Sequence, residues 1–175
     1  MKKIINILGT ITLIGLSTTS LVACNTPQEY TPEELEKLKE ENKINTVNQE
    51  IKDNLEWIVP QEKPFNKVDN KYYYVVWRGD KNDNWRIVNF KHTELKIGKI
   101  FDKYNNKYTL ELRQETGYPF YFTLYVRYSS SWAPADWESY NNGTYFKSVY
   151  SWDLLDKPEP DLVIDNGGNV KVNGE

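Results

Sequence analysis

The chain has 175 residues and a formal net charge of −3, and this length suits one ordinary domain plus a spacer. Because basic residues are not in excess, the composition excludes nucleic-acid binding as a main function. The single cysteine, Cys24, rules out an internal disulfide, and the single histidine, His92, is far short of a zinc site.

The first 24 residues predict an exported protein. Two lysines precede an apolar run from residue 4 to about residue 16, and small residues follow, which is the pattern of a secretory signal. A transmembrane helix is the alternative for such a run, but glycine, serine and threonine dilute it and no basic cluster follows. The segment ends in Leu21-Val22-Ala23-Cys24. It resembles the lipobox of bacterial lipoproteins, whose cysteine is joined to diacylglycerol before cleavage.

This resemblance implies a signal peptide at 1–23, a lipidated tether at 24–30 and a protein held on the extracellular face of the cell membrane through Cys24. A diacylglyceryl group carries two acyl chains, which suffice for lasting attachment. The chain also has 18 lysines against 4 arginines, a bias that AT-rich codons impose. Together with the opening residues, it resembles surface lipoproteins of mollicutes, most closely those of spiroplasmas. The resemblance ends near Asn25, and no family is recognised for residues 26–175.

Residues 31–60 predict one amphipathic helix. Thr31 can cap it, Pro32 suits its first position and Glu34 completes a capping box. Apolar residues then recur at helical spacing, at positions 35, 38, 44, 47, 51, 55 and 58. Asparagines interrupt any sustained heptad, so we expect the helix to pack on the domain or act as a loose spacer, rather than form a coiled coil.

From residue 71 the apolar pattern changes to a period of two, which predicts an all-β domain over residues 66–175. Eight segments rich in aromatic and β-branched residues are separated by Asn and Gly turn signals, at 72–78, 85–91, 95–101, 107–113, 120–128, 145–152, 162–165 and 170–172. Short antiparallel strands at this spacing indicate a sandwich or barrel of about seven or eight strands. In 107–113 we expect Leu110 and Leu112 to face the core and Glu111 and Arg113 to face solvent.

The connection at 129–142 is the first candidate for ligand binding. Flat aromatic faces stack on the C–H faces of sugars and carboxylates accept hydrogen bonds from sugar hydroxyls, so its residues fit a carbohydrate site. They are Trp132, Asp136, Trp137, Glu138 and Tyr140. The alternative is that these aromatic rings cover the open end of the sandwich.

The loop after the first strand is the second candidate. Arg78-Gly79-Asp80 is similar to the integrin-recognition tripeptide and would lie at a hairpin tip, although such tips favour Gly and Asp in any case. The same loop resembles the start of a calcium loop, with oxygen-bearing side chains at the alternate positions Asp80, Asn82 and Asn84. Trp85 occupies the position where an EF-hand needs glycine, so the loop could form only an irregular cation site, not an EF-hand. We therefore predict no metal or other cofactor.

Features of an enzyme are few. His92 has no cysteine or recognisable serine nucleophile to activate, and no glycine-rich phosphate loop follows a strand. The pair Asp136 and Glu138 would lie about 6–7 Å apart on an extended segment, within glycosidase range, but any acidic loop offers such a pair. We expect a surface protein without enzymatic activity that recognises a host glycan or surface protein. The alternative is a structural or antigenic coat protein with no ligand.

Overall fold

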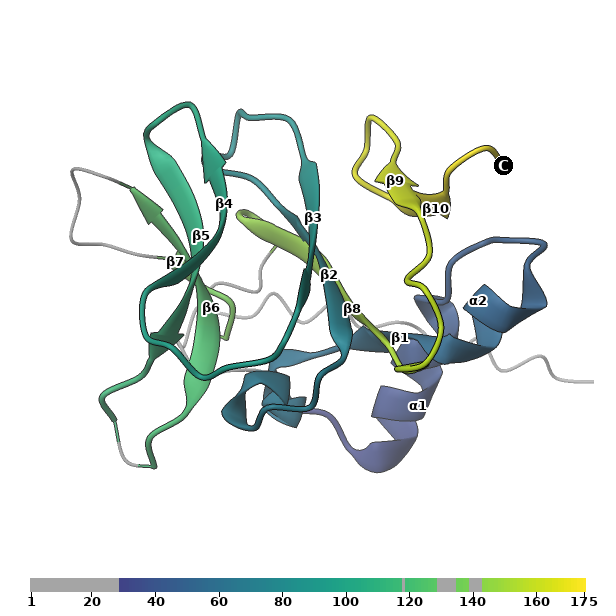
Figure 1. Ribbon diagram of the computed structural model, residues 1–175, viewed down its shortest axis with the longest axis horizontal. Helices are drawn as coiled ribbons and strands as arrows, with labels where there is room; N and C mark the ends of the chain where they lie inside the picture. Colours follow the sequence, from purple (N-terminus) through teal and green to yellow (C-terminus); the bar gives the residue numbers. More distant parts are fainter. Residues whose placement is uncertain (1–28, 118, 129–134, 139–142) are drawn as a thin grey trace, which may run out of the picture.

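The computed structural model describes residues 29–117, 119–128, 135–138 and 143–175. Within these ranges the chain forms ten strands in three antiparallel sheets, two α-helices and two short 3-10 helices. The fold is all-β, as the sequence predicts, and its two larger sheets lie face to face as a sandwich (Figure 1). The eight predicted strand segments all correspond to strands, with shifted ends.

Sheet A is the four-stranded sheet at the centre of the molecule. In sheet order it comprises β1 (Leu55–Ile58), β8 (Phe146–Trp152), β2 (Tyr72–Trp77) and β3 (Arg86–Lys91). β2 is buried on both faces, because Val75 and Trp77 enter one apolar core while Tyr74 and Val76 enter another. Sheet A is therefore the middle layer of three.

Sheet B and the C-terminal hairpin cover the two faces of sheet A (Figure 1). Sheet B runs in the order β4 (Lys99–Tyr104), β5 (Tyr108–Gln114), β6 (Phe122–Tyr128) and β7 (Ala135–Asp136). The hairpin of β9 (Leu162–Ile164) and β10 (Val170–Val172) covers the other face together with helix α2. Asn105 and Asn106, both at positive φ, make the tight turn between β4 and β5, as their turn chemistry predicts.

The prediction of one helix over 31–60 is wrong. Helix α1 (Pro32–Glu41) begins with the predicted capping box at Thr31 and Glu34 but ends at Asn42. Asn48 caps a second helix, α2 (Gln49–Asn54), through a hydrogen bond from the Ile51 amide. The chain then enters strand β1, and two 3-10 turns follow, η1 (Pro60–Glu62) and η2 (Pro64–Asn66). The side chains of Asn42 and Asn48 form hydrogen bonds with backbone groups, so the first helix ends at one asparagine and the second begins after the other.

Residues 43–65 belong to the folded domain, which corrects the domain boundary at residue 66. β1 pairs with β8 from Leu55↔Trp152 to Ile58↔Val149, and Phe65 is fully buried between the sheets. Helix α1 packs on this unit, because the Lys39 ammonium lies 2.5 Å from carboxylates of both Glu56 and Glu62. None of the helices in the described ranges is long and apolar enough to span a membrane.

The predicted solvent-facing side of β5 is only partly solvent-exposed. Glu111 is buried, at 3% exposure, whereas Arg113 is half-buried. The Arg113 Nε lies 2.6 Å from a Glu111 carboxylate oxygen, and the cross-strand neighbours Ile100 and Tyr125 flank the same side chain. Pairing with arginine allows the carboxylate to lie buried on the outer face of the sheet.

Candidate functional site

Strand β7 carries the described part of the predicted aromatic site. Its two residues pair with β6, and the next amide, Trp137 N–H, donates to the Leu124 carbonyl at 2.9 Å. The Trp137 ring is 2% exposed and lies 5.8 Å from the Phe65 ring, within the core between the sheets. It therefore cannot stack on a sugar, and its position matches the alternative in which the aromatic residues cover the core. Trp132 and Tyr140 lie outside the described residues.

The two predicted carboxylates lie on either side of Trp137. Asp136 is 8% exposed, and Glu138 is half-buried and hydrogen-bonded to Tyr121. Burial raises the pKa of Glu138 above its ordinary value. It also raises the pKa of Glu115, to which the charges of Asp136 and Glu138 add. Among the described residues no cluster of histidine, cysteine, aspartate and glutamate has the geometry of a metal site.

The Arg-Gly-Asp loop is held against the domain. The Arg78 Nε donates to the Thr144 carbonyl at 2.5 Å, and its guanidinium lies 4.2 Å from the centre of the Trp85 ring. Gly79 is buried against Tyr108, so closely that a Cβ atom would lie 2.3 Å from the tyrosine ring. The Arg78 side chain thus binds within the domain and is not presented to a receptor.

Asp80 completes the same turn but keeps one carboxylate oxygen available. Its Oδ1 accepts from the Asn82 amide at 3.0 Å, and its carbonyl accepts from the Asp83 amide at 3.0 Å. The loop is therefore organised by its own backbone, as in an Asx turn. The structure shows no hydrogen bond between the other oxygen, Oδ2, and the described residues, and Asp80 lines an open cleft.

This cleft, the tyrosine cleft, is defined by Asp80 and three tyrosines and has a volume of about 360 Å³. Tyr108 at the start of β5 pairs in register with Tyr128 at the end of β6, and their ring centres lie 5.2 Å apart. Tyr145 directly precedes β8, so both large sheets contribute a ring. Among the described residues, Gly79, Val126 and Ala135 also line it.

The electrostatics of the tyrosine cleft favour hydrogen-bond donation by the Tyr108 phenol. Burial raises the pKa of Tyr108, and the nearby charges of Asp80 and Asp83 add to the effect. All three tyrosines are half-buried, so each presents part of a ring to a ligand. A volume of about 360 Å³ lies within the range of small-ligand pockets, roughly 300–1,000 Å³. The cleft can therefore offer flat apolar surface, hydroxyl donors and a carboxylate acceptor together.

Sequence reasoning missed the tyrosine cleft because its residues are far apart in the chain. The signal that it could have used is the pairing of the predicted strands at 107–113 and 120–128, whose ends bring Tyr108 and Tyr128 together. His92, the one candidate general base, is 1% exposed and lies edge-on to the rings of Phe65 and Tyr73. Burial lowers its pKa, and its position in the core gives it no access to a substrate.

Comparison with known proteins gives one weak relationship. A stretch of 135 residues, 77% of the chain, is 25% identical to an uncharacterized protein, ORF1, of Spiroplasma virus SpV1-R8A2 B. The matched stretch spans 12% of that viral protein's length. No family model matches the chain, and no solved structure matches it. The similarity is compatible with the relationship to spiroplasmas suggested by the opening residues and carries no information about the lipid anchor.

Proposed function

We propose that this protein is a surface lipoprotein, attached to the cell membrane through Cys24, whose β domain binds a carbohydrate in the tyrosine cleft. The observation that carries the proposal is the meeting of three half-buried tyrosines and the Asp80 carboxylate around one cleft. Attachment on the extracellular face is supported by the signal sequence and lipobox, which end at Cys24.

A sugar fits this chemistry better than an apolar ligand. The tyrosine rings that line the cleft can pack on the C–H face of a pyranose, while phenol hydroxyls and the Asp80 carboxylate can exchange hydrogen bonds with sugar hydroxyls. Because Asp80 Oδ1 is held by the Asn82 amide, the carboxylate is already oriented before a ligand arrives. Such preorganisation reduces the entropy lost on binding. A host surface glycan is the class of ligand that an exported, membrane-anchored protein would meet.

The test is a glycan-array screen with residues 25–175, which include every described residue, followed by titration of any glycan found. Tyr128→Ala should weaken binding about thirtyfold or more, because truncating a stacked aromatic residue at a binding hot spot costs about 2 kcal/mol or more. Tyr72→Ala is the matched control, since Tyr72 is also half-buried but lies on β2, outside the cleft.

Three outcomes are informative. Loss of binding in Tyr128→Ala but not in Tyr72→Ala supports the tyrosine cleft. Equal loss in both variants, or loss that follows a fall in melting temperature, contradicts it. If neither the glycan array nor host surface extracts yield a ligand, the alternative of a structural coat protein is favoured.

A further inference from the structure

A second cleft lies on the outer face of sheet B, the face turned away from sheet A. It has a volume of about 360 Å³. Its lining includes Ile100, Lys103, Asn106, Lys107, Thr109 and Arg127, which define the cationic cleft. Tyr108 lines both this cleft and the tyrosine cleft, so the two adjoin at the start of β5.

The pairing register of the strands brings three positively charged side chains close together. Lys103 of β4 and Arg127 of β6 lie directly opposite Thr109 of β5, one on each side. Two strand spacings therefore separate their Cα atoms, about 10 Å. Lys107 ends the turn that leads into β5, next to the same row. All three cations are exposed, and none forms an ion pair with any residue in the described ranges.

The carboxylate in this cleft does not cancel these charges. Glu111 lies in the lining but is 3% exposed, and the Arg113 guanidinium lies 2.6 Å from its oxygen. The pair is neutral as a unit, so the exposed charge of the cleft remains that of the two lysines and Arg127. This local excess of positive charge contrasts with the net charge of −3 of the whole chain.

We propose that the cationic cleft binds the sulfate or carboxylate groups of an acidic polysaccharide. The inference rests on the proposed carbohydrate-binding function and names the class of glycan. Three cations spread over about 10 Å suit the repeated charges of such a chain better than a single small anion. Asn106 and Thr109 add hydrogen-bonding groups for sugar hydroxyls, and the half-exposed Ile100 adds an apolar surface.

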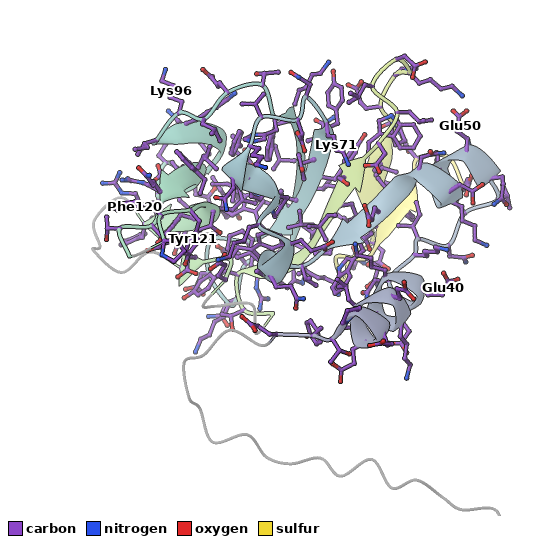
Figure 2. The ribbon with its side chains drawn as sticks, turned by 90° about the horizontal axis from the view of Figure 1, so that it is seen from below. Glu40, Glu50, Lys71, Lys96, Phe120 and Tyr121 are labelled. Carbon is purple, nitrogen blue, oxygen red and sulfur yellow. The ribbon has the colours of Figure 1, made fainter. Side chains whose placement is uncertain are left out.

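The cationic cleft lies on the side of the molecule remote from the C-terminal hairpin. Figure 1 shows sheet B on the side of sheet A opposite to the C-terminal hairpin and α2. In Figure 2, Glu40 of α1 and Glu50 of α2 lie at the end of the molecule remote from Lys96 and Phe120, which flank strands of sheet B. The outer face of sheet B therefore lies away from α2 and from the C-terminal end of α1.

The test titrates residues 25–175 with heparin, a sulfated polysaccharide, with neutral dextran and with vesicles containing anionic phosphatidylglycerol, at 150 mM salt. The decisive variant is Lys103→Gln/Lys107→Gln. Its matched control is Lys52→Gln/Lys171→Gln, which removes the same charge from two exposed lysines outside the cleft. We expect heparin binding to weaken about tenfold in the first variant and less than about twofold in the second, because only contacted cations lose an ion pair. A tenfold loss corresponds to about 1.4 kcal/mol for the two lysines together.

Other results overturn the inference. Equal weakening in both double variants would show non-specific attraction of a polyanion. Absence of heparin binding by the unmodified protein, or binding only to vesicles, would exclude a polysaccharide site. Tyr128→Ala separates the two proposals. If this variant loses a neutral glycan while heparin does not bind, only the acidic-ligand inference fails. If heparin binding depends on the lysines and Tyr128→Ala changes binding of no glycan, the tyrosine cleft fails as a site.

Discussion

Trp137→Ala tests most directly whether the aromatic residues around β7 form part of the core. The indole is 2% exposed and packs against the Phe65 ring, which is itself fully buried. Truncating a buried tryptophan or phenylalanine to alanine costs about 3–5 kcal/mol, from lost burial and from the cavity that remains. For a chain of this length each kcal/mol lowers the melting temperature by about 2–4 °C, so we expect a fall of roughly 6–20 °C.

The assay is thermal unfolding of residues 25–175 followed by circular dichroism, with Phe120→Ala as the control. Phe120 is 64% exposed, and truncating an exposed side chain away from the core changes stability by about 0.5 kcal/mol or less. The Trp137 amide hydrogen bond to Leu124 survives in the alanine variant, so the measured loss reports the side chain alone. A melting temperature for Trp137→Ala within about 2 °C of that of Phe120→Ala would refute the assignment of Trp137 to the core.

Three further predictions rest on the structure, and a fourth, for Cys24, rests on the sequence alone. Residues 66–175 alone should show no cooperative unfolding transition in circular dichroism, because they lack β1 and Phe65, whereas residues 29–175 should fold. A cooperative transition in the shorter fragment would contradict the assignment of β1 to the core. Gly79→Ala should lower the melting temperature and weaken binding in the tyrosine cleft, since its Cβ would collide with Tyr108, and unchanged values would show that the loop shifts freely. Cys24→Ser should abolish partitioning into the detergent phase, and a correctly cleaved variant that still partitions would exclude the lipid anchor. Burial lowers the pKa of His92 below 6.5, so the unfolded state binds the proton first as pH falls, and the free energy of unfolding measured with urea should decline below about pH 6.5. The decline should be less steep in His92→Gln. Identical slopes in the two proteins would exclude His92 as a source of the decline.

Strands were predictable where one segment carried its own signal. Residues 72–77 are apolar on both faces and lie in the middle layer, and the alternation in 107–113 correctly placed Leu110 and Leu112 in the core. β1 was missed because Ile51, Leu55 and Ile58 keep helical spacing through a segment that is half helix and half strand. Pairing with β8, about 90 residues away in the chain, decides its conformation, and no local pattern reports that pairing.

The candidate site was harder to predict than the fold. An aromatic residue in a connection looks exposed from the sequence, yet Trp137 continues the pairing of β7 with β6 and turns its ring inward. The tyrosine cleft is defined by residues from four separate segments of the chain, and only the pairing of strands makes them neighbours. Composition showed that tyrosine is abundant, with 13 residues, but not which of these rings remain accessible.

The pairing of β1 with β8 also has a kinetic consequence. Strand β1 can join sheet A only when Leu55 pairs with Trp152 of β8. Most of the chain must therefore be synthesised before sheet A, the middle layer of the fold, is complete. Until then β2, with its run of aromatic and β-branched residues, has a partner on one side at most, and such a segment favours aggregation. Contacts so distant in sequence slow folding. If the chain crosses a membrane unfolded, as we propose, late completion of sheet A keeps the polypeptide unfolded until its last strands have passed. The same delay predicts that truncation after residue 145, which removes β8, favours aggregation.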